Sequence, residues 1–339
     1  MTEKLSSVCL ISVYFGKFPD WINVWFLSLK HNPTIDFILV TDQNVDTSGY
    51  DNLKVINTDL DSFKMLLQSK LGMKIKLNSS YKLCDYKLVW GLALENEISK
   101  YDYWGHSDMD VVYGDIRSFL IRYKLCDYDK FGNRGHLTLY RNTKEVAERY
   151  RLTGSWFGSY KEIFKSNRIW AFDETPGINA IYNAHNFSHM NSFIYADIDV
   201  NYKDLRLVDR NDPQYVNYQN QVFYWKKGKL LRAYSKDGTM VVDEFMYIHL
   251  QKKRMQKPDF NLEEFDGFYI LNGYFEPLGS CITLDDVLKR NIRNDIDLPQ
   301  KMFGGGVQKR FAILLVRTQI FKYEVRLETS YQKVVKTLG

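Results

Sequence analysis

Short apolar runs and one stretch of helical periodicity alternate over the first sixty residues. The run at 8–15 is almost continuously apolar and stops at Gly16, which is typical of a buried strand in a parallel sheet. Apolar residues then recur at helical spacing over 21–29, and further strands are expected at 35–40 and 53–57. This succession predicts βαβ units and an α/β sheet covered by helices on both faces.

The same patterns continue through the rest of the chain. Helical spacing over 61–71 ends at Gly72, and a second helix is expected over 88–97. A further helix is expected to begin near Pro176, because proline suits the first turn of a helix. Later strands are expected at 136–142, 228–234 and 240–250, the last two compatible with a hairpin.

Ligands of open α/β sheets bind outside the carboxyl ends of the strands. In this chain that edge holds Tyr14, Phe15 and Gly16 after the first strand and Asp42 after the second. Asp42 can accept a hydrogen bond from a ribose hydroxyl or a base N–H, or it can be a simple turn carboxylate. Tyr14, Phe15 and Asp42 are therefore candidate nucleotide contacts.

Two carboxylates one residue apart end the aromatic segment at 101–107. In an extended chain Asp108 and Asp110 point to the same side, while Met109 points into the protein. Such a pair can hold Mg²⁺ or Mn²⁺, which prefer carboxylate and phosphate oxygens. A D-x-D triplet also arises by chance, so the interpretation depends on finding a nucleotide site, a third ligand and a base elsewhere in the chain.

The segment 81–87 combines two tyrosines, two lysines and an aspartate ahead of an apolar helix. Lys82 and Asp85 can grip a nucleotide and its phosphates from this position. They can equally belong to a solvated helix start. We treat both as candidate nucleotide contacts.

Composition changes this picture in three places. Aromatic residues make up 15% of the 339 residues, which suits a carbohydrate-binding pocket as well as an ordinary core. The four cysteines show no C-x-x-C pair, which indicates a reduced compartment. No convincing signal peptide and no spanning apolar stretch are found, so a cytoplasmic location is expected.

The net charge of +5 is concentrated at the end of the chain. Residues 301–339 hold eight Lys/Arg and two Asp/Glu, so residues 1–300 together carry about −1. Nucleic-acid binding is not expected, because the basic surplus is confined to this tail. The tail, 307–339, interleaves basic and apolar residues, which predicts contact with a membrane surface or a partner; the alternative is an amphipathic helix folded back on the domain.

At this point the residues carry a resemblance. The early β/α half and the run from Trp104 to Asp110 resemble a GT-A fold glycosyltransferase with its D-x-D motif. Residues 81–85 and 104–114 are similar to an uncharacterised bacterial family found among cell-surface polysaccharide glycosyltransferases. The resemblance covers residues 7–255 and implies a Rossmann-like mixed central sheet flanked by helices. It also implies a nucleotide-sugar donor, UDP-linked in our interpretation, and a glycan acceptor that can be lipid-linked.

The resemblance also directs attention to two later acidic and basic segments. Asp173 and Glu174 precede the expected helix at Pro176, where inverting members of the fold carry the carboxylate that deprotonates the acceptor. Either residue can be this base, or both can simply cap the helix. His249 resembles a third metal ligand and Lys252 a group that neutralises the donor diphosphate, against the alternatives of a structural histidine and a solvated chain segment.

Together these observations predict a metal-dependent glycosyltransferase that uses Mn²⁺ or Mg²⁺ in surface-polysaccharide synthesis, peripheral on the inner face of the plasma membrane. The catalytic domain is expected at 1–290, with a nucleotide-binding half at 1–115 and an acceptor half at 116–260, followed by a helical extension at 291–339. Two rivals remain: a sugar nucleotidyltransferase, which should carry a Gly-rich basic loop that residues 14–19 lack, and a non-catalytic glycan-binding scaffold.

Overall fold

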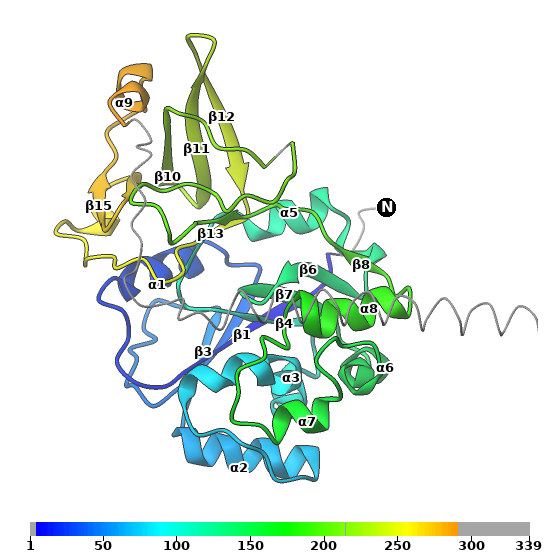
Figure 1. Ribbon diagram of the computed structural model, residues 1–339. Coiled ribbons are helices and arrows are strands. Elements are labelled where there is room, and N and C mark those ends of the chain that lie inside the picture. The colour runs from blue at the N-terminus through cyan, green and yellow to red at the C-terminus, as the bar shows by residue number, and fades with distance from the viewer. Residues whose placement is uncertain (1–4, 214, 291–339) are drawn as a thin grey trace, which may run out of the picture.

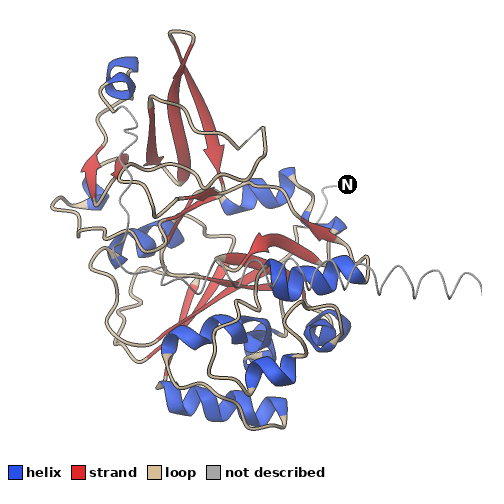
Figure 2. Cartoon of the chain, viewed as in Figure 1, coloured by secondary structure: helices blue, strands red, loops and turns tan. Residues whose placement is uncertain are grey.

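The computed structural model describes residues 5–213 and 215–290, and its largest sheet has seven strands in the order β3-β2-β1-β4-β7-β6-β8 (Figures 1 and 2). The first four strands of this order run parallel, and β7 is antiparallel to β4. This mixed central sheet flanked by helices confirms the expected α/β fold class; the expected helical extension lies outside the described residues. The strands are β1 Val8–Tyr14, β2 Asp36–Thr41, β3 Leu53–Asn57, β4 Tyr103–Ser107, β6 Lys130–Arg134, β7 Leu137–Arg141 and β8 His189–Met190.

Helices cover both faces of this sheet (Figure 1). Strand side chains alternate between two cores: Leu10 packs with α1 and α5, whereas Ile11 packs with α2, α3 and α7. Asp59 caps α2 by accepting the N–H of Ser62, and Gly72 ends it with a left-handed φ of 64°. The α-helices are α1 Ile22–Lys30, α2 Leu60–Leu71, α3 Trp90–Ala93, α4 Glu95–Ile98, α5 Ile116–Arg122, α6 Lys144–Glu148, α7 Tyr160–Phe164, α8 Ala180–Ala184 and α9 Leu284–Leu288.

Two smaller sheets extend the fold beyond α1 and α5. A five-stranded antiparallel sheet has the order β12-β11-β10-β14-β15, and a three-stranded sheet has the order β5-β13-β9 (Figure 1). The three-stranded sheet joins segments that are far apart in the chain. Their bounds are β5 Val111–Tyr113, β9 Ala196–Asp197, β10 Gln221–Lys226, β11 Lys229–Lys236, β12 Thr239–Phe245, β13 Tyr247–His249, β14 Gly267–Leu271 and β15 Tyr274–Pro277.

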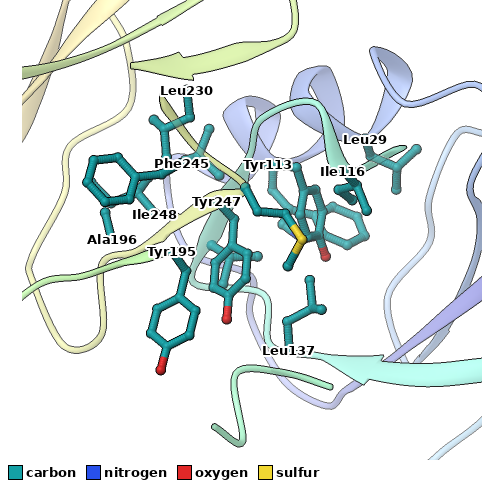
Figure 3. Packing of buried hydrophobic residues seen from close by; sticks show 14 of the residues in the cluster. Leu29, Tyr113, Ile116, Leu137, Tyr195, Ala196, Leu230, Phe245, Tyr247 and Ile248 are labelled. Carbon is teal, nitrogen blue, oxygen red and sulfur yellow. The ribbon is translucent and has the colours of Figure 1, made fainter. Parts of the chain in front are cut away.

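Several aromatic rings pack in the core beside the three-stranded sheet. Tyr195 and Tyr247 stack with ring centroids 5.3 Å apart, and Figure 3 shows their hydroxyls pointing the same way. Tyr113, from the partner strand β5, is fully buried beside Tyr247. Rigid packing of this kind holds the short strands in register, because buried aromatic rings contribute large apolar areas.

Three expected elements take a different form in the structure. The helix predicted over 88–97 is the end of a 3₁₀ helix, Ser80–Val89, followed by the short helices α3 and α4. The strand predicted over 240–250 is broken at Met246, so that β12 and β13 belong to different sheets. The helix expected at Pro176 begins as a π-helical turn, Thr175–Asn179, before α8.

Glycine at position 105 is required by the close approach of two strands. A Cβ atom at Gly105 would lie 2.3 Å from the carbonyl oxygen of Thr138 and 2.7 Å from a methyl group of Leu139. We expect Gly105→Ala to lower the free energy of unfolding by about 2–3 kcal/mol, because neither the backbone of β7 nor the core can move away cheaply. Urea denaturation measures this. Gly279→Ala is the control, since a Cβ there meets nothing within 4 Å; equal midpoints for the two variants would contradict the prediction.

Lys130 is a fully buried cation in β6. Its ammonium donates to the carbonyl of Gly132 and lies 5.7 Å from the centroid of the Tyr182 ring, and within the described residues it forms no ion pair with a carboxylate. Burial lowers the pKa of Lys130 from 10.5 to about 7. The folded protein therefore accommodates a buried charge whenever the pH is below about 7.

Replacing this lysine should stabilise the protein most at low pH. We expect Lys130→Met to raise the free energy of unfolding at pH 6 by roughly 2 kcal/mol. The pKa of Lys130 is lower in the folded than in the unfolded protein. The loss of folding stability that the buried charge causes is therefore largest below pH 7 and decreases between pH 7 and 10.5. Urea denaturation at pH 6 and pH 9 tests this, with the exposed Lys74→Met as control. A gain in stability from Lys130→Met that grows with pH would refute this prediction.

In residues 5–213 and 215–290 no helix has both the length and the apolar character that crossing a membrane requires. The predicted membrane or partner contact of 307–339 lies outside the residues that the structure describes.

Candidate active site

The three-stranded sheet gathers three polar side chains from distant segments. In its register Val111, next to Asp110, pairs with His249, and His249 pairs with Asp197. The two ring nitrogens of His249 contact different carboxylates: Nε2 lies 3.3 Å from Asp110 Oδ1, and Nδ1 lies 2.9 Å from Asp197 Oδ1. A histidine is thereby placed directly beside the D-x-D segment.

Asp108, Asp110 and His249 form a group able to hold a divalent cation. One ligand atom from each lies within 4.8 Å of the others, and Met109 is buried, as the alternation of side chains predicts. The backbone N–H of Asp108 donates to the carbonyl of His136 at 3.0 Å, which fixes the segment against the large sheet. Asp110 Oδ1 is buried, and the charged group that faces it among the described residues is His249, at 3.3 Å. A set of two carboxylates and one imidazole fits Mn²⁺ or Mg²⁺.

The charge on His249 reflects these carboxylates. Burial alone would lower its pKa, but Asp110 and Asp197 outweigh burial and raise the pKa of His249 to about 10. Without a cation the ring is therefore protonated at neutral pH. Binding of a cation at Nε2 requires release of that proton, so cation and proton compete for the same nitrogen.

Lys87 is a site residue that the sequence interpretation missed. Its buried ammonium lies 2.6 Å from Asp108 Oδ1 and 3.0 Å from Asp173 Oδ2, and it donates to the carbonyl of Gly135 at 2.9 Å. Although burial opposes the charge, Asp108 and Asp173 raise the pKa of Lys87. At three residues per turn Lys87 lies on a different face of its 3₁₀ helix from Lys82 and Asp85, and no local pattern singles it out because its partners come from distant segments.

The two acidic candidates at 173 and 174 have different surroundings. Asp173 is buried against Lys87; burial raises its pKa to about 7, with Lys87 opposing the rise and the charge of Glu174 adding to it. Glu174 is partly exposed, and its Oε2 lies 3.9 Å from Arg134. At Gly135 a Cβ atom would lie 2.1 Å from Asp173 Oδ2, so the absence of a side chain there lets the acid approach.

A polar pocket of about 330 Å³ opens beside these groups. Glu174 and His249 both line it, so the candidate base and the candidate metal ligand share one cavity. Most of its other lining residues are charged or carry amides, which suits a ligand rich in hydroxyl groups. They include Arg134, His136, Asp197, Asp199, Asn201, Arg210 and Gln251.

Lys82 and Asp85 do not face this pocket, which corrects their interpretation as nucleotide contacts. Both are buried and paired at 2.6 Å. All three ammonium protons of Lys82 have protein acceptors, since it also donates to the carbonyls of Ile163 and Arg168. Asp85 accepts the N–H groups of Trp170 and Phe172. The pair holds the loop that leads to Asp173 and leaves no donor for a phosphate.

The residues predicted at the ends of β1 and β2 differ in accessibility. Tyr14 is half-buried, and burial followed by the nearby charge of Asp110 raises its pKa, which places it near the candidate cation site. Phe15 is buried against Phe63, with ring centroids 6.0 Å apart, so its side chain belongs to the core and not to a ligand site. Asp42 is exposed and accepts the N–H of Gly16 with both oxygens, which leaves its contact with a nucleotide a prediction.

Lys252 is exposed and contacts Tyr81, whose hydroxyl is close to Asp108 and Asp110. Its ammonium is 5.7 Å from the centroid of the Tyr81 ring. Burial is the main cause that raises the pKa of Tyr81, and the charges of Asp108 and Asp110 add to it, so the Tyr81 hydroxyl lies within electrostatic range of the candidate cation site. Its role toward a diphosphate stays a prediction.

Fold and site together define an α/β protein with an acidic, histidine-containing centre at the carboxyl edge of its parallel strands. Residues 10–279 match the model of a family described as "Family of unknown function (DUF6625)", and the chain belongs to this family. No protein of curated function matches the chain.

Among solved structures, similarities are found to glycosyltransferases. The galactosyltransferase LgtC, in complex with donor and acceptor sugar analogues, is 13% identical, with 56% of this chain and 75% of LgtC covered at a TM-score of 0.35. Mouse xyloside xylosyltransferase 1, in its apo form, is 9% identical, with 56% and 87% covered at a TM-score of 0.32. Similarity at this level carries no information on the reaction.

Proposed function

We propose that this chain is a metal-dependent glycosyltransferase that transfers a sugar from a nucleotide-diphosphate donor, UDP-linked in our interpretation, to a hydroxyl group of a glycan acceptor. The observation that carries this proposal is the convergence of Asp108, Asp110 and His249 beside the pocket that Glu174 lines. The group of Asp108, Asp110 and His249 suits a cation with a diphosphate, and the polar pocket suits an acceptor with many hydroxyl groups.

In this proposal each side chain has a distinct task. Asp108, Asp110 and His249 hold Mn²⁺ or Mg²⁺, which when bound supplies positive charge against the leaving diphosphate. The exposed Lys252 adds a second positive charge toward the diphosphate. Glu174 accepts the proton of the acceptor hydroxyl, which leads to inversion at the anomeric carbon.

Asp173 and Lys87 have supporting tasks. Lys87 connects Asp108 with Asp173 through two short contacts, so it orients the first carboxylate of the D-x-D segment. Asp173 is enclosed by Lys87 and has no open face toward the pocket comparable with that of Glu174. Of the two acids, the surroundings therefore favour Glu174 as the base.

Ligand-dependent thermal stability tests the donor site. The midpoint of unfolding is measured with Mn²⁺ against a panel of nucleoside diphosphates and sugar nucleotides. A ligand at about 100 times its dissociation constant adds ~2.7 kcal/mol of stability. We expect a metal-dependent shift with one nucleotide that disappears in Asp108→Ala and Asp110→Ala. A shift that survives both substitutions, or no shift with any nucleotide, would contradict the proposed donor site.

Turnover separates an enzyme from a binding protein. With the nucleotide identified by thermal stability, release of the free nucleoside diphosphate from its sugar derivative is followed without and with added glycans. A glycosyltransferase consumes the donor slowly in water and faster with its acceptor. Binding without any consumption would instead support a glycan-binding scaffold.

A further inference from the structure

Asp197 lies on the opposite side of the His249 ring from Asp110. Its Oδ1 is 2.9 Å from His249 Nδ1, whereas Asp110 approaches Nε2. Asp197 is buried, and sequence patterns gave no reason to select it, because it lies in a two-residue strand. Its position results from the pairing of β9 with β13.

The oxygens of Asp197 are already occupied by protein groups. Oδ1 accepts from His249 and, at 2.7 Å, from the amide of Gln251, while Oδ2 accepts from the guanidinium of Arg210. Its backbone N–H donates to the hydroxyl of Tyr215 at 2.8 Å. A carboxylate held by three donors, on a backbone that is itself hydrogen-bonded, is a rigid hydrogen-bond acceptor.

We propose that Asp197 is the positioning residue of the cation site: by accepting the Nδ1 proton of His249 it directs the Nε2 lone pair toward Asp108 and Asp110. This inference rests on the proposed function, because it requires a cation between those carboxylates and His249. Ligating histidines generally donate their second ring N–H to such a partner, which fixes the tautomer and makes the ligating nitrogen more basic.

A second arrangement of the same residues competes with this one. Ligand atoms of His136, Asp197 and His249 also lie within 4.8 Å of one another, and no hydrogen-bond partner of His136 Nε2 is found in residues 5–213 and 215–290. A cation there would take Asp197 as a ligand, yet Arg210 and Gln251 already contact its two oxygens. The rings of His136 and His249 also stack, with centroids 4.3 Å apart and an interplanar angle of 25°, rather than pointing their nitrogens at one shared cation. The contacts therefore favour Asp197 as an orienting group.

Titration with Mn²⁺ tests the proposal on the full chain. Free Mn²⁺ is measured by electron paramagnetic resonance, with and without UDP. We expect Asp197→Asn to weaken Mn²⁺ binding about 10- to 100-fold, the usual effect of losing such an orienting partner, and Asp110→Ala to abolish it. The control is Asp209→Asn, an exposed carboxylate next to Arg210 in sequence that accepts the backbone N–H of Asn211.

Two further measurements show whether Asp197 acts through His249. In a His249→Ala background, Asp197→Asn should change Mn²⁺ affinity by less than about twofold, because the residue through which it acts is gone. In the wild-type protein saturated with Cd²⁺, a diamagnetic probe, ¹⁵N spectra of labelled histidine should show one ring bound through Nε2 and protonated at Nδ1. This second measurement needs no variant at Asp197 and stands even if that variant fails to fold.

The outcomes separate this inference from the proposed function. Wild-type Mn²⁺ affinity in Asp197→Asn, together with loss of binding in Asp110→Ala, would overturn the role of Asp197 and leave the cation site intact. Two metal-bound histidine rings would overturn it in favour of the site with His136. No binding of Mn²⁺ by the wild-type protein, with or without UDP, would overturn the proposed metal-dependent function itself.

Discussion

Asp110→Asn is expected to abolish sugar transfer, lowering kcat about 1,000-fold while the protein stays folded. The substitution keeps the shape of the side chain but removes one of the two negative charges that face the candidate cation. Asp110 Oδ1 is buried and faces His249 Nε2 at 3.3 Å, and within the described residues no hydrogen bond from another group to this oxygen is found. A 1,000-fold loss corresponds to ~4 kcal/mol of transition-state stabilisation, which is the range expected when a bound cation is lost.

The measurement is the initial rate of donor consumption at several Mn²⁺ concentrations, with circular dichroism as the test of folding. A variant that recovers at high Mn²⁺ has weakened affinity, whereas one that does not recover has lost the site. Asp51→Asn, in an exposed turn before β3, is the matched control and should keep the wild-type rate. If Asp110→Asn matched this control, the D-x-D segment would have no part in the reaction.

Glu174→Gln is expected to lower kcat about 100- to 1,000-fold without changing the affinity for the donor. Glu174 lines the pocket and is partly exposed, so the amide can occupy the same space but cannot accept a proton. Its long contact with Arg134, 3.9 Å, contributes little to folding. The free energy of unfolding should therefore stay within about 0.5 kcal/mol of the wild-type value.

Asp173→Asn provides the contrast within the same acidic pair. It removes one of the two carboxylates beside the buried Lys87, while Asp108 keeps that ammonium paired, so the expected loss of stability is about 1–3 kcal/mol. We therefore expect lower stability from Asp173→Asn and lower kcat from Glu174→Gln, measured by denaturation and by steady-state kinetics. If Asp173→Asn lost kcat with unchanged stability and Glu174→Gln lost nothing, the base would be Asp173.

Local sequence patterns were sufficient for elements whose partners lie nearby. The first strands and the helices α1 and α2 follow directly from apolar spacing, and the common orientation of Asp108 and Asp110 follows from the period of two. The structure brings His249 beside them, as expected. Their role as cation ligands stays a prediction that the experiments above address.

The remaining site residues depend on contacts between distant segments. A buried ion pair such as Lys82 and Asp85 looks the same in sequence as an exposed one, and only the approach of the 163–172 region shows that their hydrogen bonds are used internally. Lys87 and Asp197 were missed for the same reason, since each is defined by side chains more than twenty residues away. Phe15 was misinterpreted because the end of a strand can face either the edge or the core.

The order of the chain has a consequence for how the protein matures on the ribosome. The three-stranded sheet unites positions 111–113, 196–197 and 247–249, so its strands leave the ribosome at widely separated times. A nascent chain that ends before residue 190 already exposes both aspartates of the D-x-D segment, but it has neither Asp197 nor His249. The complete centre thus arises only late in translation, and fragments released early carry acidic side chains without the histidine that would complete a selective cation site.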